Sequence, residues 1–127
     1  MSIKAIHTNQ APAAVGPYSQ AMKAGDFLYI SGQLPMNPET GELVTSSIED
    51  ETRKSLENAV AILKEAGATL ENVVKTTVYL QNMSDFAAMN GIYAEFFANH
   101  KPARAAFEVA KLPLGANVEI EMVAYLG

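Results

Sequence analysis

The 127-residue sequence contains no cysteine. The chain can therefore form no disulfide, no thiolate nucleophile and no cysteine-ligated metal or iron–sulfur site. Its only histidines, His7 and His100, lie far apart in the sequence and have no matching ligands beside them. Zinc sites in proteins need three or four such ligands at defined spacings, so we expect no metal site. A cysteine-free chain also fits a reducing compartment.

Basic residues are few as well, with 9 Lys and Arg against 14 Asp and Glu, giving a net charge of −5. This charge would repel a phosphate backbone, and no basic run longer than Arg53-Lys54 offsets it locally, so we expect no nucleic-acid partner. No segment approaches the roughly 20 apolar residues of a membrane span, and the N-terminal segment lacks a basic stretch followed by an apolar run. We expect a cytoplasmic protein with no membrane partner.

Apolar residues, in contrast, make up 49% of the sequence and charged residues only 18%. The length suits one domain spanning residues 1–127, large enough to bury a core without disulfides or metals. This composition is apolar for a soluble chain and hints that a partner subunit covers some of the apolar surface, because large exposed apolar patches mark interaction sites. We therefore expect the chain to form an oligomer.

The patterns along the chain predict strands and helices in a clear order. A hairpin over 22–30 turns at Gly25-Asp26, and an ordered loop follows from Gly32 to Val44. A first helix begins at a capping box of Ser46 and Glu49 and ends at Gly67, and a second begins at an N-cap, Ser84. The predicted strands outside the hairpin cover 3–8, 73–80, 104–110 and 118–126. This order predicts an α+β fold in which two helices pack on one face of a mixed sheet.

Strand alternation predicts which side chains face the helices. In the 73–80 strand, Val74, Thr76, Val78 and Leu80 share one face. In the segment RAAFEVA, the apolar pair Phe107 and Val109 is assigned to the core, which places Arg104, Ala106 and Glu108 on the face without helices. Nothing else in the chain covers that face, so we expect sister subunits to pack against it at residues such as Tyr79, Val123 and Tyr125.

Arg104 is the most informative candidate, because it interrupts the small and apolar residues of PARAAFEVAKLP. One interpretation is structural: the guanidinium pairs with Glu119 or Glu121 of the last strand. Both glutamates alternate with Ile120 and Met122 and are therefore predicted to lie on the face without helices. The other is that Arg104 binds the carboxylate of a small ligand, which suits its planar, two-pronged donor geometry. The alanines around it, Ala103, Ala105 and Ala106, would leave room for such a ligand.

Two further candidates lie earlier in the chain. Ser31, in SGQLP, has no evident base beside it, which argues against a nucleophilic serine, and the motif lacks the lysine and the glycines of a phosphate loop. Tyr18 follows Gly16-Pro17 and is interpreted either as an anchor of its loop in the core or as a functional group.

Four stretches in order point to a known family: APAAVGPYSQA, YISGQLPMNPETGE, VVKTTVYLQNMSDFAAMNGIYAEFF and PARAAFEVAKLPLGANVEIE. Through these stretches the sequence resembles the Rid family (YjgF-like proteins), the reactive intermediate deaminases, over essentially its whole length. The resemblance implies a chorismate-mutase-like α+β fold, assembled as a homotrimer with ligand clefts between subunits. It also implies cofactor-independent hydrolysis of 2-imino acids, such as 2-iminopropanoate and 2-iminobutanoate, to 2-keto acids and ammonia.

The resemblance assigns roles to individual residues. Arg104 matches the carboxylate-binding arginine of the family, and Glu119 matches the acidic residue that orients the attacking water. Many relatives have Ser-Cys where this chain has Ala105 and Ala106, so no thiol step is available and Ala106 would contribute only its backbone carbonyl. The remaining matches are residues of the cleft wall: Tyr18, Ser31, Gly32 and Asn90.

Two alternatives to the deaminase stay open on the sequence. A non-catalytic module that senses or carries small carboxylates would use the same arginine. A ribonuclease or translation inhibitor, an activity ascribed to some relatives, is disfavoured by the acidic charge and the absence of a basic patch.

Overall fold

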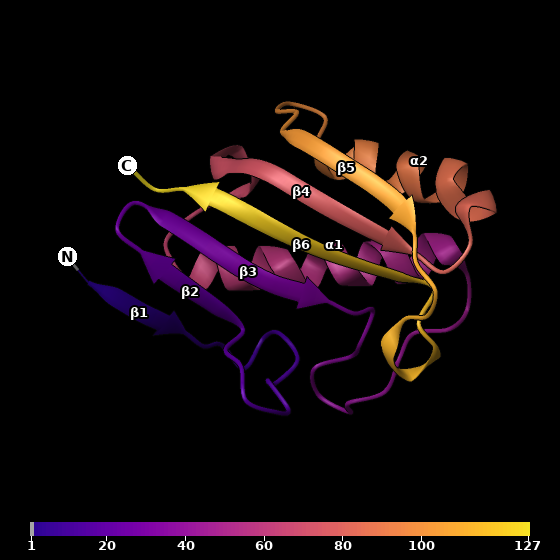
Figure 1. The fold of residues 1–127 in the computed structure, drawn as a ribbon, viewed down its shortest axis with the longest axis horizontal. Helices are drawn as coiled ribbons and strands as arrows, with labels where there is room; N and C mark the ends of the chain where they lie inside the picture. Colours follow the sequence, from indigo (N-terminus) through magenta and orange to yellow (C-terminus); the bar gives the residue numbers. More distant parts are fainter. Residues whose placement is uncertain (1) are drawn as a thin grey trace.

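The computed structural model describes residues 2–127 as one mixed sheet with two helices (Figure 1). This confirms the predicted α+β architecture. The strands are β1 (Ile3–Ile6), β2 (Ala21–Ala24), β3 (Phe27–Gln33), β4 (Val73–Leu80), β5 (Ala103–Glu108) and β6 (Val118–Tyr125). The helices are α1 (Ile48–Glu65) and α2 (Phe86–Phe96), with short 3₁₀ turns η1 (Leu70–Asn72), η2 (Met83–Asp85) and η3 (Pro113–Gly115).

The six strands lie in the order β1-β2-β3-β6-β4-β5. All neighbouring pairs are antiparallel except β4 and β5, which are parallel. A parallel pair needs a crossover connection, and α2 supplies it on the same side of the sheet as α1 (Figure 1). The strand order leaves β5 at one edge of the sheet, next to α2.

The core lies between the sheet and the two helices. The apolar stripe of α1, which includes Leu56, Ala59, Ile62 and Leu63, is completely buried. It packs against alternate residues of the strands, among them Leu28, Val78 and Ile120. None of the helices within residues 2–127 is both long and apolar enough to cross a membrane.

The helix starts differ from those predicted. Ser47, not Ser46, caps α1 by accepting a hydrogen bond from the Asp50 amide at 3.0 Å, while the Ser46 hydroxyl donates to the Asp50 carboxylate at 2.6 Å. Helix α2 begins at Phe86 after η2, and Asp85, rather than Ser84, occupies the cap position without a side-chain bond. Adjacent polar residues offer alternative caps, and the preceding chain path selects among them.

The strands also correct two predictions. A bulge between Val73 and Lys75 shifts the alternation of β4, so that Val73 is buried and Val74 is 43% exposed. Gly32 and Gln33, predicted as the start of a loop, extend β3. A bulge places an extra residue in one strand, which reverses the alternation at that point without any sequence signal of its own.

The largest correction concerns β5. Its parallel register pairs Arg104 with Thr76 and Phe107 with Tyr79, and register partners share a face of the sheet. Thr76 is buried beneath α2, where its hydroxyl bonds to that of Tyr93 at 2.7 Å. Arg104 therefore lies on the helical face, whereas Phe107 is 45% exposed on the opposite face and meets the Tyr79 ring edge-on at 5.3 Å.

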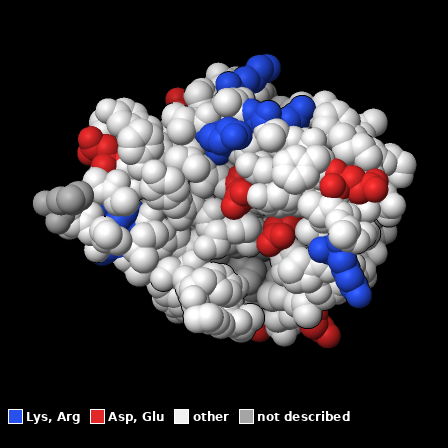
Figure 2. All heavy atoms as spheres, viewed as in Figure 1, with Lys and Arg blue, Asp and Glu red and all other residues white. Residues whose placement is uncertain are grey.

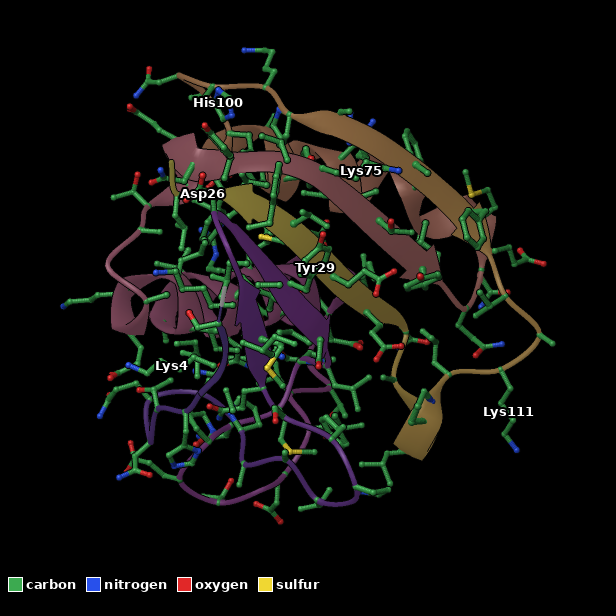
Figure 3. All side chains as sticks on the ribbon, turned by 60° about the vertical axis from the view of Figure 1, so that its left-hand side comes forward. Lys4, Asp26, Tyr29, Lys75, His100 and Lys111 are labelled. Carbon is green, nitrogen blue, oxygen red and sulfur yellow. The ribbon has the colours of Figure 1, made fainter. Side chains whose placement is uncertain are left out.

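The face of the sheet away from the helices is called the open face below. The prediction that Tyr79, Val123 and Tyr125 lie on it is confirmed, because their neighbours Val118, Ile120, Met122 and Ala124 of β6 belong to the core. Tyr29 and Lys75 also lie on this face, where they share a shallow depression with Glu121 (Figure 3). Several of its large side chains are exposed, among them Phe27, Tyr29, Phe107 and Tyr125.

Asn58 ties the segment after β3 to α1. Its side-chain amide is buried and donates to the carbonyls of Leu34 and Met36 at 3.1 and 2.9 Å. Asn58→Ala would remove this donor from the Met36 carbonyl and leave the Leu34 carbonyl with the Met36 amide alone, so we expect a loss of about 1–3 kcal/mol in the free energy of unfolding. Urea unfolding measures this loss, and the exposed Asn99→Ala is the control, expected to change stability by less than about 0.5 kcal/mol. Equal effects of the two variants would contradict the assignment.

Candidate functional site

The largest group of predicted site residues lines one pocket at the edge of the open face. The pocket has a volume of about 620 Å³ and contains Tyr18, Ser31, Gly32 and Glu119. Strands β3 and β6 provide Ser31, Gly32 and Glu119, and the loop before β2 provides Tyr18. In Figure 2, which views the open face, acidic side chains lie near its centre beside a hollow. This space is called the Glu119 pocket below.

The Glu119 carboxyl lies directly against the backbone of β3. A Cβ atom added to Gly32 would lie 2.5 Å from Glu119 Oε2, so only glycine leaves space for the carboxyl there. Burial raises the pKa of Glu119, and the negative charge of Glu121 raises it further. A carboxyl with a raised pKa accepts a proton more readily than an exposed one, which suits a general base.

Gly32→Ala is therefore expected to move the Glu119 carboxyl while leaving the fold intact. The added methyl meets the flexible end of a side chain, which can rotate away, and not the backbone. We expect the pKa of Glu119 to fall toward its ordinary value as the carboxyl moves into solvent. Carboxyl NMR titration of the variant measures this, with Gly91→Ala, where nothing lies within 4 Å of the added Cβ, as the control. An unchanged Glu119 titration would contradict the expected displacement.

The other residues of this pocket have defined structural roles. The Ser31 hydroxyl donates to the Ser19 carbonyl at 2.6 Å, and the Ser31 amide donates to the Gln20 carbonyl at 2.9 Å, so Ser31 joins β3 to the loop before β2. Tyr18 is 53% exposed, which contradicts its interpretation as a core anchor. The buried Gln20 anchors the loop instead. Its side-chain amide donates to the backbone carbonyls of Thr8, Ala11 and Pro12. Sequence reasoning missed Gln20.

Arg104 and Asn90 lie together at a second pocket, of about 450 Å³, on the helical side of β5. The Arg104 Nη1 atom donates to Asn90 Oδ1 at 2.6 Å. The guanidinium carbon lies 4.7 Å from the centre of the Tyr93 ring and 5.4 Å from that of Phe86. Helix α2 therefore orients the guanidinium through one hydrogen bond and two aromatic rings.

The structural interpretation of Arg104 as the partner of Glu119 or Glu121 is wrong. Within residues 2–127 the guanidinium forms no ion pair, and both glutamates lie on the other face of the sheet. Arg104 is exposed, so most of its N–H groups remain accessible to a ligand. Ala106, on the same face of β5 as Arg104, is half-buried against the core, so its side chain does not reach the Glu119 pocket.

The predicted site residues thus form two groups that one chain does not bring together. Glu119 and Phe107 both pair with Tyr79 across neighbouring strands, and Arg104 lies three residues before Phe107. With about 4.8 Å between strands and 3.3 Å between residues, the Cα atoms of Arg104 and Glu119 are on the order of 14 Å apart. Because their side chains also point to opposite faces, they cannot contact the same small molecule within one chain.

The chain thus combines an α+β sheet that has helices on one face with an acidic pocket on the other face and an arginine on the edge strand. The chain belongs to the endoribonuclease L-PSP family, to which the YjgF and Rid proteins also belong. The sequence model of that family matches residues 8–126. The match covers both groups of site residues.

Individual relatives match almost the whole chain. A RutC family protein of Pyrococcus horikoshii is 56% identical over 94% of this chain and 95% of its own length. A mouse protein named 2-iminobutanoate/2-iminopropanoate deaminase is 49% identical over 98% of this chain and 92% of its own length.

Solved structures share the fold. A Rid family protein of Yersinia pestis has a TM-score of 0.95 at 46% identity and covers 98% of this chain and 99% of its own. E. coli TdcF, solved with bound serine, has a TM-score of 0.93 at 39% identity and covers 98% of this chain and 99% of its own. The mixed sheet with two helices on one face is therefore the fold of the Rid proteins.

Proposed function

We propose that the chain hydrolyses 2-imino acids, such as 2-iminopropanoate and 2-iminobutanoate, to 2-keto acids and ammonia without a cofactor. The observation that carries this proposal is the half-buried Glu119 carboxyl, with its raised pKa, at the wall of a pocket large enough for a small organic acid. The name of the mouse relative supports the same reaction. The RutC name of the Pyrococcus relative does not specify one.

In this proposal Arg104 binds the substrate carboxylate. Asn90 occupies only one nitrogen of the guanidinium, and the rings of Tyr93 and Phe86 hold its plane. The remaining N–H groups can donate two parallel hydrogen bonds to a carboxylate, which fixes both the position and the orientation of the substrate. A fixed orientation presents one face of the C=N bond to water.

Glu119 accepts and donates the protons that move during the hydrolysis. As a water oxygen bonds to the imine carbon, the C=N electron pair moves to nitrogen and Glu119 takes a proton from the water. Glu119 then returns this proton to the nitrogen. Glu119 next takes the hydroxyl proton of the resulting carbinolamine and passes it to nitrogen, so that the C–N bond breaks, the hydroxyl oxygen becomes the keto oxygen and ammonia leaves. Atoms balance as one imine and one water giving one keto acid and one ammonia.

Both residues act on one substrate only if the site lies between two copies of the chain, and we propose a homotrimer. Arg104 stands on an edge strand, where it can extend toward a neighbouring copy, and the Glu119 pocket opens at the face that carries exposed aromatic side chains. Covering that face removes apolar surface from water at each contact. A closed ring repeats the same contact around its axis and produces equivalent clefts.

The direct test generates 2-iminopropanoate with an amino-acid oxidase and lets semicarbazide compete for it. A deaminase lowers the semicarbazone yield and raises that of pyruvate and ammonia as enzyme is added. An unchanged semicarbazone yield at micromolar protein would refute the proposed reaction.

A second candidate is a carboxylate-binding module without turnover, and the serine bound to E. coli TdcF favours it. The same Arg104 would hold the carboxylate of the ligand. Calorimetric binding of a 2-keto acid or amino acid, together with no effect on the semicarbazide assay, would identify this function instead.

A further inference from the structure

Glu119 has two polar neighbours on the open face, Glu121 and Tyr79, to which the proposed hydrolysis gives no role. Glu121 lies two residues further along β6 on the same face, and it lines the same pocket as Glu119. Tyr79 stands on β4 directly opposite Glu119 in the strand register. Its hydroxyl donates a hydrogen bond to Glu121 Oε1. Tyr79 and Glu121 thus form a pair that borders Glu119.

The geometry of this pair is fixed from both sides. The Phe107 ring packs edge-on against the Tyr79 ring at 5.3 Å and sets its orientation. The hydrogen bond to Glu121, followed by burial, raises the pKa of Tyr79 to about 12, so the phenol remains a proton donor at any working pH. The phenol in turn holds the Glu121 carboxylate in one rotamer.

We propose that Tyr79 and Glu121 act together as a positioning pair, which keeps a fixed negative charge beside Glu119 so that Glu119 holds the transferred proton. This inference rests on the proposed hydrolysis. That reaction needs one carboxyl that first accepts a proton from water and then returns it to nitrogen. When two carboxylates in one pocket have different surroundings, one can carry the proton while the other stays charged. Here only Glu121 receives the phenol hydrogen bond.

Other ionisable groups near this pair do not replace it. Tyr18 from the loop before β2 faces the Glu119 pocket, and Tyr29 of β3 and Lys75 of β4 lie beside Glu121. Neither Tyr29 nor Lys75 forms a hydrogen bond or ion pair with a glutamate among residues 2–127. Lys111, after β5, points outward from the molecule (Figure 3).

The kinetic test compares pH profiles of kcat/KM for wild type, Tyr79→Phe, Glu121→Gln and the double variant. Phenylalanine keeps the ring contact with Phe107, so Tyr79→Phe removes only the hydrogen bond. In wild type, activity falls on the acid side as Glu119 becomes protonated. Both single variants are expected to shift this acid limb to lower pH and to lower kcat by about two- to a hundredfold, with KM unchanged. The double variant should match Glu121→Gln, because Tyr79 acts only through Glu121.

A second measurement does not require activity. NMR titration of ¹³C-labelled glutamate, assigned with Glu119→Gln, is expected to show Glu119 titrating at lower pH in both single variants than in wild type. Tyr29→Phe, on the same open face, is the matched control and should leave the titration unchanged. If wild type hydrolyses no imine, the proposed function fails while the titration still decides whether the pair controls Glu119. Glu119 titrations identical in wild type, Tyr79→Phe and Glu121→Gln would overturn the inference.

Discussion

Replacing Arg104 with alanine is expected to lower kcat/KM for 2-iminopropanoate by a factor of about 30 to 4,000. Truncating one partner of a desolvated charge pair costs about 2–5 kcal/mol, because the other charge remains without its partner. In the proposed hydrolysis that charge is the carboxylate of the 2-imino acid. Arg104→Lys keeps the positive charge but loses the planar pair of donors, so it should fall between wild type and alanine. The semicarbazide competition assay measures all three.

Lys101→Ala is the matched control, because Lys101 lines the same pocket and is exposed. It should retain activity close to that of wild type. Arg104 also packs on Tyr93 and Phe86, so thermal unfolding and the size of the assembly must be compared to separate a lost receptor from a loosened α2. An Arg104→Ala protein that folds and keeps its activity would show that Arg104 does not belong to the site.

A mixing experiment tests whether each site is shared between two copies of the chain. If Arg104 and Glu119 of one site come from different copies, Arg104→Ala chains and Glu119→Gln chains refolded together should regain activity that neither shows alone. Random assortment in a closed ring leaves about a quarter of the sites with both native residues. No recovery from a properly mixed assembly would place both residues of a site in one chain, against the geometry described above.

Glu119→Gln is expected to lower kcat by about a hundred- to ten-thousandfold, the range for loss of a general acid–base, while raising stability at neutral pH. The sign follows from the raised pKa of Glu119. A carboxyl whose pKa is higher in the folded chain contributes its full stability below its ordinary value of 4.5, and this contribution is lost as the pH rises through the raised value. Above this raised pKa the wild type carries an ionised, half-buried carboxylate that glutamine does not.

Thermal unfolding at pH 4 and pH 7 measures this effect. The Glu119→Gln variant should unfold at a higher temperature than wild type at pH 7, and the difference should shrink at pH 4. Glu39→Gln, at an exposed loop position, controls for the change in net charge. A Glu119→Gln variant less stable than wild type at pH 7 would mean that the carboxylate is stabilised where it lies.

The architecture followed from the sequence because its signals were local. The apolar spacing of α1, the Gly25-Asp26 turn and the alternation of β6 each depend on neighbouring residues, and the structure confirms them. The alternation of β6 also indicated correctly that Glu119 and Glu121 lie away from the helices.

The face of Arg104 could not be derived in the same way. Alternation along β5 gives two opposite assignments, and Phe107 favoured the wrong one because the open face is itself rich in aromatic side chains. Only the register between β5 and β4 distinguishes the two assignments. The two strands are separated in the sequence by α2, so no local pattern predicts how they pair. The hydrogen bond between Tyr79 and Glu121 depends on a long-range pairing in the same way.

Because Arg104 and Glu119 lie on opposite faces of the sheet, different elements hold the two parts of the proposed site. Asn90, Tyr93 and Phe86 of α2 orient the arginine, while β3 and β6 hold the glutamate. A substitution along α2 can change the orientation of the arginine without straining the strands that hold Glu119. In the proposed hydrolysis, ligand preference and acid–base chemistry could therefore evolve independently.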